Sequence, residues 1–159
     1  MKLTTFTDYS LRVLIYLAAQ PAERATIAQI AGAFQVSENH LVKVVHFLGK
    51  QGWLANVRGK GGGLELGMPP EAIIVGRVVR ETEGTDPIAE CFGDTDGDCA
   101  IAPDCRLRGV LGESIKAFYG VLDRYTLADL VNNRQRLAQV LFIERDAAER
   151  KPRGPGARS

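Results

Sequence analysis

The sequence has few cysteines, few histidines and no long apolar run, and each shortage excludes a class of protein. Its 159 residues include three cysteines and two histidines. Apolar stretches are short and interrupted by charge, so no segment predicts a membrane-spanning helix. The N-terminus lacks the apolar run and cleavage site of a signal peptide, which predicts a cytoplasmic location. We find no Cys-x-x-Cys pair, dinucleotide fingerprint or Ser/His/Asp set, so the alternative of an enzyme, such as a small thiol oxidoreductase, is disfavoured.

Charge is distributed unevenly, although the formal net charge is only +1. Residues 1–60 carry seven Lys or Arg and three Asp or Glu. Residues 81–105 carry no Lys or Arg, whereas they contain the acidic residues Glu81, Glu83, Asp86, Glu90, Asp94, Asp96, Asp98 and Asp104. A basic first part and an acidic middle part predict two different tasks for the two regions.

The first third of the chain contains three amphipathic helical patterns separated by short turns. Residues 7–19 predict a helix with Thr7 as its N-cap. Thr26 begins a capping box that opens the second helix. Ser37 can cap a third helix that ends at Gly52. The buried stripe of this third helix is expected to consist of Leu41, Val44, Val45 and Leu48.

Two short strands follow, on either side of a glycine-rich basic turn. Residues 53–57 and 64–66 predict the strands, and the turn reads Arg58-Gly59-Lys60-Gly61-Gly62-Gly63. The order helix, helix, turn, helix, hairpin is that of a winged helix-turn-helix. We therefore expect a mainly α protein with a small β-hairpin, in which residues 1–75 form a winged helix-turn-helix DNA-binding domain.

The remaining chain alternates between helical patterns and segments without periodicity. Residues 75–83 predict a short helix, and the Gly- and Asp-rich residues 84–104 predict a loop. Apolar residues recur every three or four positions from Asp104 to Tyr125, which predicts a helix of about 30 Å. Thr126 can cap a last helix. Residues 133–159 are expected to be a C-terminal tail that is partly disordered.

The candidate DNA-reading residues lie on the third helix, opposite its apolar stripe. This polar face consists of Ser37, Asn39, His40, Lys43, His46 and Lys50. The N-terminal end of a recognition helix meets base edges in the major groove. Lys43 and Lys50 can reach phosphates or guanine. The alternative is an ordinary solvated helix face.

The hairpin turn favours DNA binding over that alternative. Arg58 and Lys60 stand on a turn with almost no side-chain bulk, and such a tip can enter the minor groove. Glycine-rich turns also bind phosphates in enzymes, but between a strand and a helix. This turn lies between two strands, which disfavours nucleotide binding. Phe47 is expected to pack inside the protein rather than to stack on a base.

The three cysteines, Cys91, Cys99 and Cys105, lie in or next to the acidic loop. An odd number disfavours a disulfide framework and leaves metal binding or redox chemistry. Thiolates suit iron–sulfur clusters, Zn²⁺ and Cu(I). Structural zinc usually has cysteine pairs two to four residues apart and a fourth ligand. Longer spacings can surround a bulkier cluster, although clusters commonly have four protein ligands. Three ordinary or redox-reactive thiols remain an alternative.

Five stretches resemble the iron–sulfur winged-helix transcriptional regulators: residues 1–9, 57–63, 75–81, 99–107 and 125–130. The resemblance spans residues 1 to about 131 and does not cover the tail beyond about Ile143. It implies that the protein is a homodimer that binds double-stranded promoter DNA. It also implies that residues 76–132 contain the cluster loop and a long dimerisation helix.

The resemblance is strongest to the nitric-oxide-sensing branch of this family. It implies an iron–sulfur cluster ligated by Cys91, Cys99 and Cys105, whose loss in response to nitric oxide relieves repression. It also implies that Asp8 of the partner subunit is the fourth ligand, which favours a 4Fe-4S over a 2Fe-2S cluster. Apart from the resemblance, Asp8 is explained by the preference for acidic residues in the first turn of a helix.

Two departures from the family pattern bear on this interpretation. The spacer between Cys91 and Cys99 is longer than usual, which affects the path of the loop and not the ligand set. Family members that regulate cluster assembly have a histidine three residues after the third cysteine, where this chain has Arg108. Arginine cannot ligate iron. A regulator of the same fold that senses iron–sulfur status or redox state is therefore the alternative function.

Overall fold

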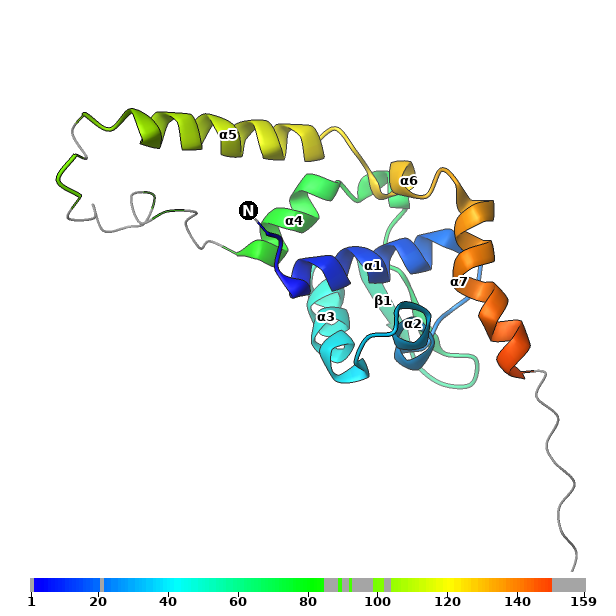
Figure 1. Ribbon diagram of the computed structural model, residues 1–159. Coiled ribbons are helices and arrows are strands. Elements are labelled where there is room, and N and C mark those ends of the chain that lie inside the picture. The colour runs from blue at the N-terminus through cyan, green and yellow to red at the C-terminus, as the bar shows by residue number, and fades with distance from the viewer. Residues whose placement is uncertain are drawn as a thin grey trace, which may run out of the picture.

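The computed structural model describes residues 2–20, 22–84, 89, 92, 99–101 and 104–149. Helix α1 (Thr5–Ala19) runs through the centre of the molecule, with elements on both sides of it (Figure 1). One side carries α2 (Ile27–Phe34), α3 (Glu38–Lys50), β1 (Leu54–Val57) and β2 (Gly63–Leu66). The other carries η1 (Pro70–Ala72), α4 (Val75–Glu83), α5 (Arg106–Leu122) and α6 (Leu127–Leu130). The mainly helical fold with one hairpin confirms the predicted fold class.

The core lies between α1, α2, α3 and the hairpin. Each of these elements buries one apolar face, as the helical and strand patterns predicted. The largest fully buried side chains there include Leu14, Ile30, Leu41, Leu48 and Trp53. Trp53 is only 2% exposed and stands where α3 gives way to β1, so it fixes the hairpin against the helices.

Helix α1 begins earlier than the sequence predicted. Its N-cap is Thr4, whose hydroxyl accepts a hydrogen bond from the Thr7 backbone at 3.2 Å. The predicted role of Thr7 as N-cap is wrong, because the Thr7 side chain is buried and donates to the hydroxyl of Thr82 at 2.8 Å. Thr7 therefore joins α1 to α4 instead of capping the N-terminus of α1.

The turn between α2 and α3 has a defined backbone geometry. The capping box at Thr26 is present, as predicted. At the other end of α2, Gln35 adopts the left-handed conformation, and Val36 donates to the Ala31 carbonyl at 3.0 Å. Ser37 occupies the N-cap position of α3, but within the described residues its hydroxyl makes no capping hydrogen bond. The predicted side-chain cap is therefore not formed within the described residues, although Ser37 does occupy the N-cap position.

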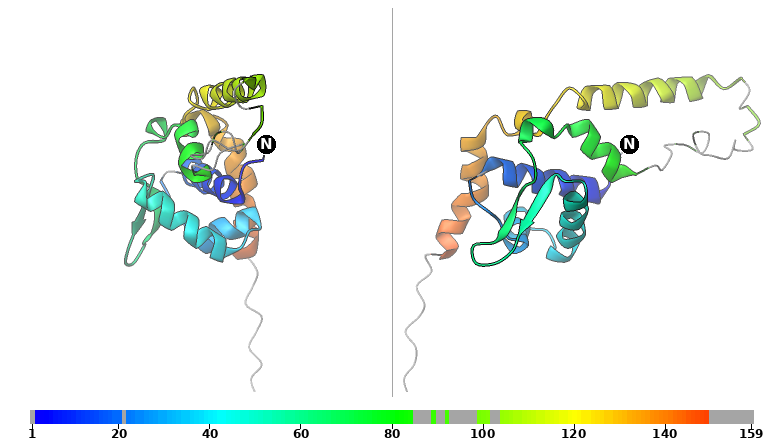
Figure 2. Two further views of the ribbon diagram at one scale, coloured as in Figure 1. Left: turned by 90° about the vertical axis from the view of Figure 1, so that its left-hand side faces the viewer. Right: turned by 180° about the vertical axis from the view of Figure 1, so that it is seen from behind.

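The hairpin is antiparallel and is extended by a third segment. Leu54 pairs with Leu66, and Val57 pairs with Gly63. Leu64 also exchanges two backbone hydrogen bonds with Ala25, of 2.7 and 3.0 Å, which the sequence did not predict. The hairpin is thereby attached to the connection between α1 and α2. Figure 2 shows it beside α3, with its turn extending away from the body of the protein.

Helix α5 projects away from the other elements, and its C-terminal end lies beside α4 (Figures 1 and 2). It lies within the predicted span and is slightly shorter at both ends. None of its described residues is buried, and Leu107 and Val110 are 60% and 58% exposed. Among the described residues, no helix combines the length and apolar character needed to cross a lipid bilayer.

The sequence pattern did not predict α7 (Arg134–Glu149), which occupies much of the C-terminal segment. Helix α7 packs against α1 and α2 on the outside of the core (Figure 1). The Phe142 ring meets the Tyr16 ring edge to face at 5.0 Å between centroids. Leu137 and Leu141 also pack against the core. This part of the segment is therefore an ordered addition to the core.

Candidate nucleic-acid interface and cysteine segment

Helix α3 presents to solvent a polar face that carries two lysines. The six residues predicted for this face are all exposed: Ser37, Asn39, His40, Lys43, His46 and Lys50. The opposite face is buried in the core, as predicted. The backbone N–H groups at the N-terminus of α3 add partial positive charge beside Ser37 and Asn39. Such a face can hold an anion and donate hydrogen bonds to it.

Helix α1 supports α3 from behind through aromatic contacts. The Phe6 and Phe47 rings meet edge to face, with 5.3 Å between centroids. This contact confirms that Phe47 is a packing residue. The Tyr9 ring lies 6.2 Å from the imidazole of His40 at the exposed end of α3. A movement of the N-terminal half of α1 would therefore also displace α3.

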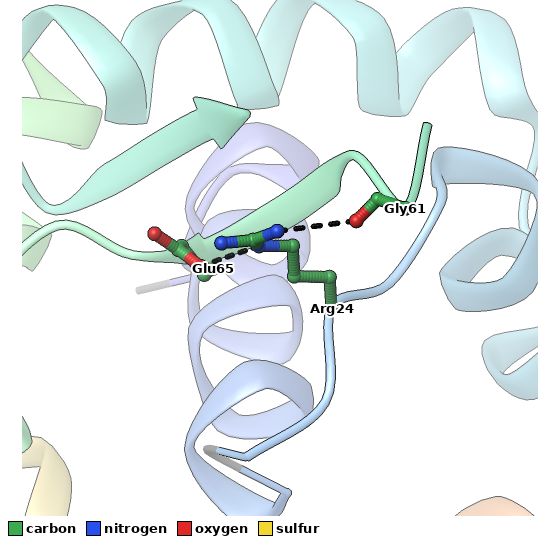
Figure 3. Close-up of polar contacts among 3 residues, drawn as sticks. All are labelled: Arg24, Gly61 and Glu65. Atoms are coloured by element: carbon green, nitrogen blue, oxygen red, sulfur yellow. Dashed lines mark hydrogen bonds and ion pairs between the residues drawn. The ribbon is translucent and has the colours of Figure 1, made fainter. Parts of the chain in front are cut away.

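The wing is the turn of residues 58–62 with its two strands, and its residues Arg58 and Lys60 are exposed. Arg24 braces it from the α1–α2 connection. Its guanidinium pairs with the Glu65 carboxylate at 2.7 Å and donates to the Gly61 carbonyl at 3.1 Å (Figure 3). A side chain at Gly63 would lie only 3.0 Å from the Ala25 carbonyl oxygen, so glycine permits this close approach.

Arg24 is not among the residues that the sequence predicted for this interface. It stands among polar residues before the second helix, and its partners are 37 and 41 residues away in the chain. No local pattern signals such a pairing. The bracing orients the two predicted cations of the wing, Arg58 and Lys60, relative to α3.

We expect Arg24→Ala to weaken operator binding about two- to fivefold, the range that loss of an exposed ion pair corresponds to. The loss arises because the wing becomes less ordered, not because a DNA contact disappears. The dependence of binding on salt should therefore stay unchanged. Arg58→Ala should instead reduce the slope of log K against log salt by about 1.

The measurement is fluorescence anisotropy with a labelled operator at several salt concentrations. Glu65→Ala serves as the matched control, because it removes the partner of Arg24 without removing a cation. It should reproduce the effect of Arg24→Ala. A flattened salt dependence in Arg24→Ala would mean that Arg24 itself touches phosphate, contrary to the bracing role.

Two cysteines are described: Cys99, which precedes α5 in the chain, and Cys105, which stands at its start. Cys99 is exposed, whereas Cys105 is half-buried at the N-cap position of α5, and neither forms a disulfide. Cys91 lies outside the described residues. Its chain neighbour Phe92 lies against α5, with Arg108 6.0 Å from its ring centroid and Gly112 alongside. Among the described residues alone, no three potential metal ligands come together.

Asp8 lies on the first turn of α1, as predicted. Its carboxylate pairs with the Arg12 guanidinium four residues later, at 2.8 Å. Both side chains are more than one third exposed, so the carboxylate remains accessible from outside this chain. Within one chain, Asp8 is explained by this ion pair and by the helix dipole. Its role as a ligand in a dimer stays a prediction.

The first turn of α1 is joined to the last turn of α4. The Thr4 backbone and hydroxyl donate to the Glu83 carboxylate at 2.8 and 3.1 Å. Beside them lies the buried hydrogen bond between Thr7 and Thr82. Burial raises the pKa of Glu83, but the hydrogen bonds from Thr7 and Thr4 together lower it by more, and the net pKa lies below its ordinary value. Residues 84–105, which contain the three cysteines and are called the cysteine segment below, follow directly after this contact.

We expect Glu83→Gln to destabilise the fold by roughly 1 kcal/mol near neutral pH, because a charged acceptor is replaced by a neutral one. A lowered native pKa means that the carboxylate stabilises the fold above its ordinary value of 4.5 and loses this effect as pH falls below it. The difference in unfolding free energy between wild type and variant should therefore be constant from about pH 6 to about pH 8 and shrink below about pH 4.5. Urea unfolding at several pH values measures it. An equal difference at about pH 3.5 and pH 7 would show that the charge of Glu83 is not involved.

An ion pair between Arg80 and Asp123 joins α4 to the end of α5. Both guanidinium nitrogens of Arg80 donate to the Asp123 carboxylate, at 2.5 and 2.7 Å. The hydrogen bonds from Arg80 hold the pKa of Asp123 below its ordinary value. The Arg80 guanidinium also lies 4.5 Å from the Tyr119 ring centroid. The cysteine segment therefore leaves from α4 and returns to a helix that is fastened to α4.

A recognition helix with a cationic face, a braced wing and a projecting helix define a winged-helix DNA-binding regulator. The chain belongs to the Rrf2 family, described as "Iron-dependent Transcriptional regulator", which it matches over residues 3–133. The protein is thus a transcriptional regulator and not an enzyme.

The chain is similar to several regulators of this family. It is 51% identical over 145 residues to the HTH-type transcriptional regulator NsrR of Bacillus subtilis, covering 91% of this chain and 99% of that protein. It is 47% identical over 142 residues to NsrR of Geobacillus kaustophilus, covering 89% and 97%. Among solved structures, T. potens IscR has a TM-score of 0.68 at 26% identity, covering 86% and 90%. CymR, the global cysteine regulator of B. subtilis, has a TM-score of 0.64 at 30% identity, covering 84% and 98%.

Proposed function

We propose that this protein is a cytoplasmic repressor that binds double-stranded promoter DNA as a homodimer and releases it when nitric oxide attacks an iron–sulfur cluster. The observation that carries the proposal is the way α4 and α5 are held at the two ends of the cysteine segment. The segment starts at the end of α4 that is hydrogen-bonded to the first turn of α1. It returns at α5, which is fastened to α4 through Arg80 and Asp123. Helix α1 in turn supports α3.

The proposed DNA contacts combine the two exposed cationic elements. Helix α3 enters the major groove, with its N-terminal residues at base edges and its lysines at phosphates. The wing tip enters the adjacent minor groove, where the negative potential favours arginine. The residues that would make these contacts are Ser37, Asn39, His40, Lys43, Lys50, Arg58 and Lys60, all of which are exposed.

The proposed homodimer is supported by the exposed apolar side chains of α5. Leu107 and Val110 are more than half exposed on this helix, and Val121 is 45% exposed. Apolar side chains at this spacing form a stripe that a second copy of α5 can cover. A dimer places two recognition helices on DNA, which requires a separation of about 34–36 Å between successive major grooves.

The donor atoms of this chain fit an iron–sulfur cluster. The proposed ligands are Cys91, Cys99, Cys105 and Asp8 of the partner subunit, and this set favours 4Fe-4S over 2Fe-2S. Cys105 stands at the N-terminus of α5, where the helix dipole favours negative charge such as that of a metal-bound thiolate. When bound, the cluster supplies iron that reacts with nitric oxide.

The residues around the cysteine segment would transmit its change of shape to DNA. Glu83 and Thr82 lie at its start and hold Thr4 and Thr7 of α1. If the segment relaxes, α1 loses these restraints, and the orientation of α3 becomes less defined. A coupling free energy of about 1–3 kcal/mol changes DNA affinity about 5- to 150-fold, which is enough for a genetic switch.

The test is a nitric oxide titration of anaerobically purified protein, followed by absorbance and EPR beside an operator-binding assay. We expect the visible absorption to bleach and the operator to be released over the same range of nitric oxide. Operator binding that persists after the absorption has bleached would contradict the proposal. Cluster-free protein that binds its operator as tightly as loaded protein would contradict it as well.

The alternative is a regulator that senses iron–sulfur status or redox state, and the similarity to T. potens IscR is the observation in its favour. Arg108, at the position of a histidine in the cluster-assembly branch, places its guanidinium over Phe92. It thus has a packing role in this chain. Release by oxygen or a chelator at doses that match nitric oxide would favour the alternative.

A further inference from the structure

One apolar side chain stands on the otherwise polar exposed face of α3. Val42 is 51% exposed. It follows Asn39 by three residues and precedes His46 by four, so the three side chains form one row along the helix. The core contacts of α3 are made by its opposite face. Val42 is therefore an apolar group at the centre of the surface proposed to meet DNA.

Val42 borders an apolar hollow of about 460 Å³ between α3, the start of α2 and β1. Ile27, Val45 and Leu54 contribute carbon atoms to it, whereas His46 and Asn56 contribute polar groups. An occupant of this surface would have to bring a small apolar group toward Val42 and polar groups toward its neighbours.

The charge of the surroundings favours a polyanion as that occupant. Lys43 and Lys50 lie on the same face of α3, and the positive end of the helix dipole is close by. Within α3, Glu38 is the single acidic residue. A nucleic acid duplex meets both requirements, because it presents phosphates at its edges and base edges within its grooves.

We propose that Val42 contacts the C5-methyl group of a thymine in the major groove and so selects an A·T pair at that position of the operator. This inference rests on the proposed DNA-binding function and names a residue that sets its sequence preference. Among the four bases, thymine alone presents a methyl group in the major groove. A cytosine there would present an amino donor, which valine cannot accept and which would lose its water.

The test replaces thymine by deoxyuridine, which removes the methyl group and leaves base pairing intact. The operator is first selected from a pool of random duplex DNA with the full-length, cluster-loaded protein. Each thymine is then replaced in turn. At one position per half-site, wild-type affinity should fall about fourfold, the factor that corresponds to burial of one methyl group. Val42→Ala should bind the thymine operator more weakly and should not distinguish thymine from uracil there.

Val140→Ala is the matched control, because Val140 is a 76% exposed valine on α7, outside the proposed interface. It should behave as wild type on both operators. Alanine favours helix formation, so Val42→Ala should keep its fold, which circular dichroism and affinity for random DNA confirm.

Two results would overturn the proposed Val42 contact and leave promoter recognition intact. One is a wild-type affinity that is insensitive to uracil at every position. The other is a thymine preference that Val42→Ala retains in full. If selection yields no preferred sequence, the proposed promoter recognition fails together with this contact. The two failures are thus distinguishable.

Discussion

We expect Cys105→Ser to remove the visible absorption of anaerobically purified protein and to weaken operator binding by up to about 150-fold, the upper range of allosteric coupling. Serine is close in size to cysteine, but its hydroxyl is a poor ligand for iron compared with a thiolate. The half-buried position of Cys105 at the N-cap of α5 tolerates this change, since serine is itself a favoured N-cap residue. The loss is therefore chemical rather than structural.

Absorbance, iron content and anisotropy with the operator measure this effect. Cys99→Ser should act in the same way, because both thiols are proposed ligands. Ser114→Ala, in the exposed middle of α5, is the control for a small change in the same helix. Retention of a normal spectrum by Cys105→Ser would remove Cys105 from the ligand set. Retention of operator affinity by a colourless variant would separate DNA binding from the cluster.

The same assay distinguishes the two roles of Asp8. As an intrachain partner of Arg12, it contributes only helix stability, and Asp8→Ala would leave the spectrum and its response to nitric oxide unchanged. As a ligand supplied across the dimer, its loss would alter both. The exposure of this carboxylate is compatible with either role.

Local signals in the sequence were sufficient for most elements of the fold. The capping boxes that open α2 and α6 occur where Thr26 and Thr126 predicted them. The start of α1 was misplaced because Thr4 and Thr7 both have the chemistry of an N-cap. The choice between them depends on Thr82, which lies 75 residues further along the chain and buries the Thr7 hydroxyl.

Helix α7 was missed because charged residues at both ends of the segment obscure a short apolar group at residues 137–143. Leu137, Leu141 and Phe142 are the ones that reach the core. The contact of Phe142 with Tyr16 of α1, and the packing of Leu137 and Leu141 on the core, supply the burial that an isolated segment of this composition would lack. Tertiary packing therefore decides its conformation.

The exposed residues of the candidate interface could be predicted, whereas the contacts that position them could not. Periodicity alone identifies which residues of α3 face solvent. The brace of Arg24 on Glu65 and the pair of Arg80 with Asp123 join residues more than forty positions apart. The sequence offers many charges of each sign, and only the fold selects these partners.

The second large effect is expected at Gly76, where α4 meets the end of α5. A methyl group on Gly76 would overlap the Asp123 carboxylate and come within 2.9 Å of the Asp123 backbone nitrogen. The carboxylate can move, but the backbone can do so only if α5 shifts. Gly76→Ala should therefore destabilise the protein by about 3 kcal/mol, or about 6–12 °C in Tm.

Calorimetry measures this loss, and two further variants separate its causes. Asp123→Asn keeps the shape of the side chain and removes its charge, so it should cost no more than about 1 kcal/mol, as exposed ion pairs do. Gly76→Ala combined with Asp123→Gly removes the overlap with the carboxylate and retains the approach to the backbone. This double variant should recover part of the stability. No recovery would mean that the carboxylate overlap contributes nothing.

Gly76→Ala also tests whether the α4–α5 contact transmits the signal. If α4 and α5 must be held together for the cysteine segment to act on α1, a shift of α5 will weaken that action even in protein that is folded and fully loaded. The ratio of operator affinities between loaded and cluster-free protein should then fall toward 1, below the roughly 5- to 150-fold expected of the wild type. An unchanged ratio in the folded variant would show that the signal reaches α1 through Thr82 and Glu83 alone.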